Sequence, residues 1–176
     1  LEDGPGFLGA LSKKLPADFF QTAGCSLHHG YGGATLAWWA ARKLVPNGAR
    51  ALTISDYVAS ALCGIAATDV THAASWGLLN VEIRTWNEPV LNALEIPATL
   101  LPEIKPGGAP LGPISPSMAT RFGLPASVMV HVPIGDNQAS VLGATGIRDD
   151  RVVLNLGTGG QISIPRRTPR YLPELE

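Results

Sequence analysis

Apolar residues recur with helical spacing in the first half of the chain and gather in short β-type runs in the second half. Residues 53–64 carry the clearest helical pattern, which predicts a helix with Thr53 or Ser55 as its N-cap and Gly64 at its end. A second helix is predicted over residues 34–44, after a glycine-rich loop. The pattern therefore predicts a mixed α/β chain with helices early and strands late.

Turn-forming residues mark further short elements in the middle of the chain. Asn87 and Ser115 are each followed within two residues by proline, which predicts two short helices with these residues as N-caps. Residues 68–87 show no helical period and contain several Thr and Ser residues, so we expect a loop with short strands there. Residues 100–115 are rich in proline and predict an extended connector.

The pattern changes most abruptly at Gly135. The apolar run of residues 128–134 predicts a buried strand, and a helix is predicted from Asp136 to about Thr145. Residues 151–165 then contain two β-rich runs on either side of Gly-Thr-Gly-Gly, which predicts a hairpin. A strand-to-helix junction followed by a hairpin is therefore expected in the last part of the chain.

Three polar residues, Asp136, Asn137 and Gln138, stand where the predicted strand passes into the helix. Ligands of open α/β sheets bind in the crevice at the carboxyl ends of the strands. One acceptor suffices to cap a helix, which contributes about 1 kcal/mol, whereas a carboxylate beside two carboxamides also suits a ligand with several hydroxyl groups. The local sequence alone does not decide whether Asp136 caps the helix or belongs to a ligand-binding site.

The glycine-rich turn that follows has two interpretations of its own. Such a turn between strands can direct backbone N–H groups at an anion, and Thr158 adds a hydroxyl donor. Taken alone, the same residues form an ordinary hairpin turn. Asp136 lies one short helix earlier in the chain. In combination, the turn would bind a phosphate group and Asp136 would accept the proton of a hydroxyl group beside it.

Composition and charge restrict the class of protein further. The 176 residues suffice for one domain or for one domain and part of another. An apolar fraction of 45% indicates a globular rather than a disordered chain, and a charged fraction of 15% is low for a complete soluble protein. A net charge of −1 gives no reason to expect nucleic acid or an anionic membrane as a partner. No apolar run reaches the roughly 18–20 residues needed to cross a bilayer, so no membrane association is expected.

The chain carries no signal-peptide pattern and only two cysteines, Cys25 and Cys63, which favours a reduced, cytoplasmic setting. It also lacks an initiator Met, so we expect it to begin and end inside a longer protein.

Other kinds of site fit the residues less well. Cys25, His28 and His29 have no downstream partners at the spacing of a four-ligand metal site, so no metal site is expected within the chain. Ser140 lies in a predicted helix rather than in a Gly-x-Ser-x-Gly elbow, which argues against a Ser/His/Asp hydrolase. For His72, a structural role and a position facing a cleft are both open.

Six stretches, taken in order, resemble the FGGY carbohydrate kinases, which belong to the actin-like, ribonuclease H-like ATPase superfamily. They read GYGGATLAWW, ALTISDYVASALCG, TDVTHAASWGLLNVEIRTWN, ALEIPATLLPEIKPGGAPLG, GDNQASVLG and LNLGTGG. Each stretch is weak alone, and the order and spacing of all six are specific. Within the family, GYGGATL, HAASWGL and the last two stretches look most like the members that phosphorylate sedoheptulose.

The resemblance implies part of an actin-like ATPase fold of class α/β. Residues 1–149 would form the later part of the first, sugar-binding domain, and residues 150–176 the start of the second, ATP-binding domain. It also implies ATP-dependent phosphorylation of a sugar hydroxyl, with a ketose such as sedoheptulose as the substrate. ATP and Mg²⁺ would be the cofactors, and a homodimer is a further possibility.

The resemblance assigns roles to particular residues. Asp136 would be the general base that accepts the proton of the attacking hydroxyl, while Tyr31 and Asn137 would lie along the sugar. The transferred phosphate would meet three residues of the turn, Gly157, Thr158 and Gly159.

The chain departs from the family pattern at both ends. The Asp-x-Gly-Thr-Thr-like hairpin that binds Mg²⁺ and phosphate is absent, as is the Gly-Gly adenosine segment, so the metal ligands are expected mainly outside this chain. We therefore expect the isolated chain to be inactive. The alternative is a kinase-like module that binds a sugar or a partner without transferring phosphate.

Overall fold

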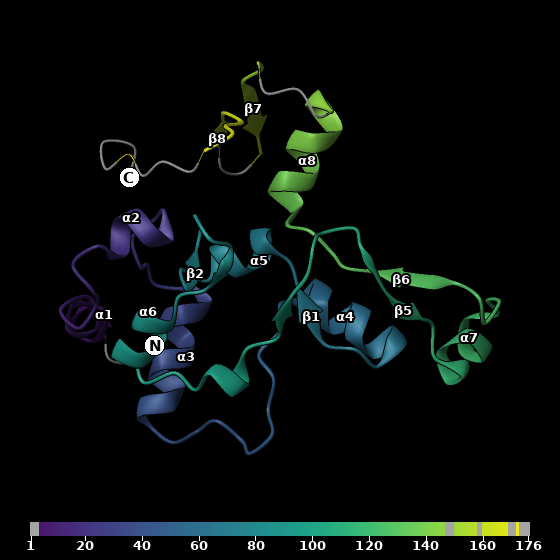
Figure 1. Cartoon of the computed structure of the whole chain (residues 1–176), viewed down its shortest axis with the longest axis horizontal. Coiled ribbons are helices and arrows are strands. Elements are labelled where there is room, and N and C mark those ends of the chain that lie inside the picture. The colour runs from purple at the N-terminus through teal and green to yellow at the C-terminus, as the bar shows by residue number, and fades with distance from the viewer. Residues whose placement is uncertain (1–3, 147–149, 158–159, 169–171, 173–176) are drawn as a thin grey trace.

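The computed structural model describes residues 4–146, 150–157, 160–168 and 172. Its helices and short strands form two neighbouring groups, and a helix followed by a β-hairpin projects from the junction between them (Figure 1). The architecture is mixed α/β, as the sequence predicts.

The first group contains the N-terminal helices, a short hairpin and a 3₁₀ turn, at the left of Figure 1. Its elements are α1 (Gly4–Ser12), α2 (Phe19–Ala23), α3 (Gly32–Ala41), β2 (Leu79–Asn80), β3 (Thr85–Trp86), α6 (Glu88–Ala93) and η1 (Ala98–Leu100). This group holds the larger hydrophobic core, in which Phe19, Leu78 and Val90 are at most 1% exposed.

The second group contains one long helix, short strands and a second helix, at the right of Figure 1. Its elements are α4 (Ile54–Cys63), β1 (Ala67–Thr68), β4 (Glu103–Ile104), β5 (Pro110–Pro113), α7 (Pro116–Phe122) and β6 (Met129–His131). Its core is small and consists of Ala59, Ala67, Leu111 and Val132. Helix α5 (Val70–Ser75) follows β1 directly and lies between the two groups.

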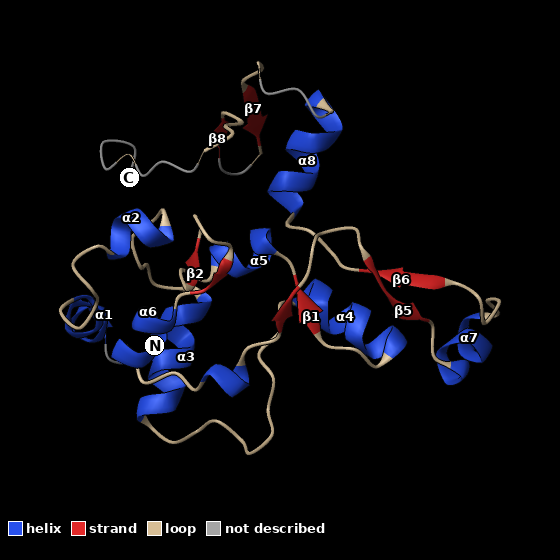
Figure 2. Cartoon of the chain, viewed as in Figure 1, coloured by secondary structure: helices blue, strands red, loops and turns tan. Residues whose placement is uncertain are grey.

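The projecting part contains α8 (Asp136–Thr145) and the hairpin of β7 (Val153–Leu156) and β8 (Gly160–Ser163). Each strand of the described residues pairs with one other strand only (Figure 2). Strands β1 and β4 are parallel, and the other three pairs are antiparallel. In β7–β8, Leu156 lies opposite Gly160, so the glycine-rich turn closes a hairpin as predicted.

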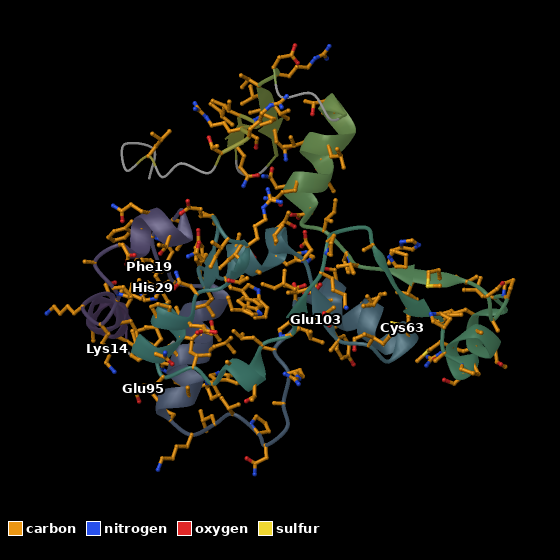
Figure 3. The ribbon with its side chains drawn as sticks, in the orientation of Figure 1. Lys14, Phe19, His29, Cys63, Glu95 and Glu103 are labelled. Carbon is orange, nitrogen blue, oxygen red and sulfur yellow. The ribbon has the colours of Figure 1, made fainter. Side chains whose placement is uncertain are left out.

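Labelled side chains in Figure 3 locate the two groups. Phe19 and the ion pair between Lys14 Nζ and Glu95 Oε1, 2.9 Å apart, lie in the first group, and Cys63 lies in the second. Both members of the ion pair are more than half exposed (52% and 70%), so the pair adds little stability. The first group is therefore stabilised mainly by its apolar core.

The predicted helices with clear caps are confirmed. Thr53 caps α4 by accepting a hydrogen bond from Asp56 N, and Gly64 ends the helix at φ 80°. Asn87 caps α6 through its side chain in the same way. Ser115 occupies the N-cap position of α7 without a side-chain bond to that helix. Helices α1 and α2 are not predicted, because the first is rich in glycine and the second spans only five residues.

Two predictions for the middle of the chain are wrong. Residues 128–134 do not form a buried strand, because β6 is three residues long, pairs only with β5 and leaves Met129 44% exposed. Residues 68–87 include a helix, α5, in addition to the short strands. This helix spans six residues, too few to show a hydrophobic period, and Asp69 caps it by accepting a hydrogen bond from His72 N at 3.0 Å.

Candidate active site

A cleft of about 700 Å³ lies where α5, the start of α4, the start of α8 and strand β8 meet. Hydroxyl, carboxamide, imidazole and carboxylate groups are among those that line it. The polar lining residues used below are Tyr31, Thr53, Ser55, Thr71, His72, Asp136, Asn137 and Gln161. Three sequence-predicted site residues, Tyr31, Asp136 and Asn137, therefore share one cleft.

Asp136 is the first residue of α8, and Gly135 occupies the cap position before it. The Asp136 carboxylate is exposed, and its Oδ1 accepts a hydrogen bond of 2.7 Å from Asn137 N. That bond satisfies one free N–H group of the first turn, where a negative charge also complements the helix dipole. No other hydrogen bond to this carboxylate comes from the described residues, so it stays available to a ligand in the cleft.

Asn137 presents an unsatisfied acceptor at the same helix terminus. Its Oδ1 is buried and has no hydrogen-bond partner among the described residues. A buried carboxamide oxygen without a donor costs about 1–3 kcal/mol, so such a group in a native site indicates a missing donor. A ligand hydroxyl group is a donor of the required kind.

Tyr31 reaches the cleft from the loop before α3. Its ring packs edge-on against His28, with the ring centroids 5.4 Å apart at an interplanar angle of 70°. Close packing continues beside it, since a Cβ atom at Gly32 would lie 2.7 Å from the Trp76 ring. The two glycines after Tyr31 thus let the start of α3 approach the end of α5, which brings Tyr31 to the cleft.

The hairpin contributes Gln161, the second residue of β8, to the cleft. Gly157, which follows β7, is described and exposed and does not line the cleft. The predicted phosphate-binding residues Thr158 and Gly159 lie outside the described residues. The glycine-rich turn therefore belongs to the same hairpin as a cleft residue.

A network of buried polar residues lies next to the cleft, and the sequence analysis does not identify it. Asp56 is fully buried, and its Oδ2 accepts hydrogen bonds of 2.8 Å from Thr53 Oγ1 and Thr68 Oγ1. His72 Nδ1 lies 3.3 Å from Asp56 Oδ1, and His72 Nε2 lies 3.2 Å from Ser55 Oγ. His72 thus has both of the roles left open for it, because it lines the cleft and contacts a buried carboxylate.

Asp69 anchors a second part of this network. The carboxylate is 1% exposed, and its Oδ1 accepts hydrogen bonds from His72 N and from Thr71 Oγ1. Thr71 Oγ1 in turn accepts a hydrogen bond of 2.7 Å from Gly135 N. An aspartate directly after a short strand, with a threonine two residues later, is the sequence signal that could have identified the bond between Thr71 and Asp69.

Among the described residues, no three or more His, Cys, Asp and Glu side chains group as a metal site would require. Cys25 and Cys63 form no disulfide bond within the part of the chain that the structure describes. No helix in the part of the chain that the structure describes is long and apolar enough to span a bilayer.

The fold is that of solved carbohydrate kinases. The ligand-bound xylulose kinase from Lactobacillus acidophilus superimposes with a TM-score of 0.85 at 24% identity, over 96% of this chain and 35% of that one. The gluconate kinase from the same organism gives a TM-score of 0.79 at 25% identity, over 89% of this chain and 32% of that one. The chain therefore shares its fold with these carbohydrate kinases.

Residues 9–143 match the family model described as the FGGY family of carbohydrate kinases, N-terminal domain, and the chain belongs to this family. The sedoheptulokinases of Mus musculus and Homo sapiens are 35% and 34% identical to it over 142 residues. These matches cover 78% of this chain and 29% of each relative. The chain therefore spans less than a third of the length of these relatives.

Proposed function

We propose that the protein containing this chain phosphorylates a sugar hydroxyl with ATP and that Asp136 is the general base. The observation that carries this function is the position of the Asp136 carboxylate. It stands at the start of α8 in a polar cleft shared with Tyr31 and Asn137, and no described residue neutralises it. Membership of the FGGY family supports the same reaction.

In this reaction the sugar oxygen attacks the γ-phosphorus of ATP while its proton passes to the Asp136 carboxylate. The bond from the γ-phosphorus to the bridging oxygen breaks, and ADP leaves with that oxygen. Phosphoryl transfer proceeds through a loose transition state, so orientation of the hydroxyl matters more than strong basicity. An exposed carboxylate on the first turn of a helix meets this requirement, because the helix fixes its direction.

The other polar residues of the cleft would hold the sugar. Asn137 Oδ1, which lacks a donor among the described residues, would accept a hydrogen bond from a sugar hydroxyl. Tyr31 would lie along the sugar, oriented by its packing against His28. We assign the transferred phosphate to Gly157, Thr158 and Gly159, the residues between β7 and the strand that carries Gln161.

ATP is the proposed phosphate donor, and Mg²⁺ would neutralise its phosphates. Asp136 is the one acidic residue that lines the cleft among the described residues, and they contain no group of metal-ligating side chains. We assign the metal ligands mainly to sequence outside this chain.

We also propose residues 1–149 as part of the sugar-binding domain and residues 150–176 as the start of the ATP-binding domain. The family match to residues 9–143 and the separate position of the β7–β8 hairpin support this boundary. The similarity to sedoheptulokinases supports a ketose such as sedoheptulose as the substrate.

The test compares Asp136→Asn with the wild type in the full-length polypeptide. Loss of general-base assistance should lower kcat by about 10²–10⁴-fold. Asp18→Asn is the matched control, since this carboxylate precedes α2 without a side-chain cap bond and does not line the cleft. ADP formation coupled to each sugar is the measurement, and a variant with near-normal kcat would rule out Asp136 as the base.

A sugar screen tests the substrate with the same assay. Sedoheptulose, xylulose, ribulose, gluconate and glycerol are compared at equal concentrations, and the highest kcat/KM is expected with sedoheptulose. Highest kcat/KM with glycerol or gluconate would contradict the ketose assignment. No phosphorylation of any sugar by the wild type would instead favour a kinase-like module that only binds.

A further inference from the structure

A chain of two hydrogen bonds joins a buried carboxylate to the backbone just before Asp136. Thr71 Oγ1 donates to Asp69 Oδ1 at 2.8 Å and accepts from Gly135 N at 2.7 Å. The Thr71 hydroxyl thus links the start of α5 to the cap position of α8. Residues 71 and 135 are far apart in sequence, so this contact belongs to the tertiary structure.

The carboxylate end of this link is firmly held. Asp69 is 1% exposed, follows β1 directly and also accepts a hydrogen bond from His72 N. Strand β1 in turn pairs with β4. Because its position is fixed by a strand pair and a helix cap, Asp69 can orient the Thr71 hydroxyl toward Gly135.

The backbone at the other end of the link is confined from two sides. A Cβ atom at Gly135 would overlap Gln138 Oε1 and would lie 3.2 Å from Thr71 Oγ1. A Cβ atom at Gly107 would overlap Ile134 Cγ2 and would lie 3.1 Å from Asp69 Oδ2. The absence of side chains therefore lets Gly135 approach the Thr71 hydroxyl and lets Gly107 approach Asp69 and Ile134.

Helix α8 has few other attachments that could hold its N-terminus in place. Of its ten residues, Thr145 at the opposite end is the buried one. Asp136 itself is exposed and makes its hydrogen bond within its own helix. The direction of the Asp136 carboxylate thus depends on how the preceding peptide is held.

We propose that Thr71 is a positioning residue whose hydroxyl fixes the Gly135 peptide and thereby aims the Asp136 carboxylate across the cleft. This role rests on the proposed function of Asp136. Thr71 acts through the helix terminus, so its loss should change the rate of phosphoryl transfer rather than the binding of the sugar. Misplacement of a reacting group by about 1 Å can cost on the order of 10²-fold in rate.

The test uses Thr71→Val, which keeps the shape of the side chain and removes the hydroxyl. In the full-length polypeptide we expect kcat to fall by about 10- to 100-fold, with the KM values for sugar and ATP within twofold of the wild type. Thr71→Ser restores the hydroxyl and should recover most of kcat. Thr145→Val is the matched control, because it removes a buried hydroxyl that donates to Val141 O at the far end of α8.

A double variant separates positioning from a general structural effect. Thr71→Val combined with Asp136→Asn should have the kcat of Asp136→Asn alone, since residues that act through one group are not additive. Thermal unfolding checks that each variant is folded, and Thr71→Ala replaces Thr71→Val if the latter does not fold.

The outcomes distinguish failure of the role proposed for Thr71 from failure of the proposed function of Asp136. Normal kcat for the hydroxyl-free variant beside an inactive Asp136→Asn would overturn the role of Thr71 alone. A raised sugar KM with unchanged kcat, or losses that add in the double variant, would also overturn it. No phosphorylation by the wild type, or full activity of Asp136→Asn, would overturn the proposed function and the role of Thr71 with it.

Discussion

At the level of single residues, the network next to the cleft contains buried carboxylates that accept hydrogen bonds from hydroxyl groups. Asp56 and Asp69 are almost completely buried, and each accepts a hydrogen bond from a threonine hydroxyl. A buried carboxylate is tolerated when such donors replace its hydration. We therefore expect the hydroxyl groups of Thr53, Thr68 and Thr71 to contribute more to stability than their small size suggests.

Thr68→Val tests this expectation for the most buried pair. Thr68 Oγ1 donates to Asp56 Oδ2 at 2.8 Å, and both residues are 0% exposed. The substitution keeps the β-branched shape and removes one donor to a charge, so we expect a loss of about 1.5–3 kcal/mol in the free energy of unfolding. Urea denaturation of the 176-residue chain is the measurement.

Thr120→Val serves as the control for that experiment. Thr120 Oγ1 donates to Pro116 O on the exposed face of α7, so its loss should stay within about 0.5 kcal/mol. Equal, small losses in both variants would contradict the importance of the buried carboxylate network.

The sequence indicates the candidate site residues better than it indicates the residues that hold them in place. Asp136 and Asn137 are recognisable because polar residues follow an apolar run at a helix start, and the structure places both in the cleft with Tyr31. The Thr71–Gly135 contact joins residues 64 positions apart. No local pattern specifies which threonine meets which backbone amide, so this part of the site requires the tertiary structure.

At the level of secondary-structure elements, predicted helix caps locate two helix starts correctly in this chain. Helices α4 and α6 begin after Thr53 and Asn87, whose side chains accept the expected backbone hydrogen bonds. Helix α5 is missed because six residues are too few to show a period. Strand β6 is shorter and more exposed than predicted, since an apolar run alone does not reveal that only one strand pairs with it.

Glycines in helices provide a prediction at the same level, because their effect depends on what the helix packs against. A Cβ atom at Gly33 in α3 would lie 2.6 Å from Trp76 O and 2.9 Å from Leu78 Cδ2. We expect Gly33→Ala to destabilise the chain by about 1–3 kcal/mol, since overpacking outweighs the better helix propensity of alanine.

Gly9→Ala in α1 should have the opposite sign. Among the described residues, no atom other than those of its neighbours and its own helix backbone lies within 4 Å of a Cβ at Gly9. The gain in helix propensity, up to about 1 kcal/mol, should therefore appear as added stability. Thermal or urea unfolding of both variants measures the difference. Similar effects of the two substitutions would show that close packing of α3 against Trp76 is not what requires Gly33.

At the level of the whole molecule, burial is distributed unevenly among the three parts. The first group holds most of the core residues, including Phe19, Leu78 and Val90. The second group has a core of four residues. In the β7–β8 hairpin, by contrast, Leu154, Leu156 and Ile162 are 59%, 75% and 70% exposed.

This distribution predicts an order of local stability within the 176-residue chain. Backbone amides open more easily where few apolar contacts cover them. Native-state hydrogen exchange should therefore show the strongest protection in α3 and α6, which flank the larger core, and weak protection in β7, β8 and α8. Phe19→Ala should lower the protection of α3 and α6 while leaving that of the hairpin unchanged, because it removes a side chain of the first core. Hairpin amides as protected as those of α6 would contradict this order and would indicate that the hairpin folds cooperatively with the first group.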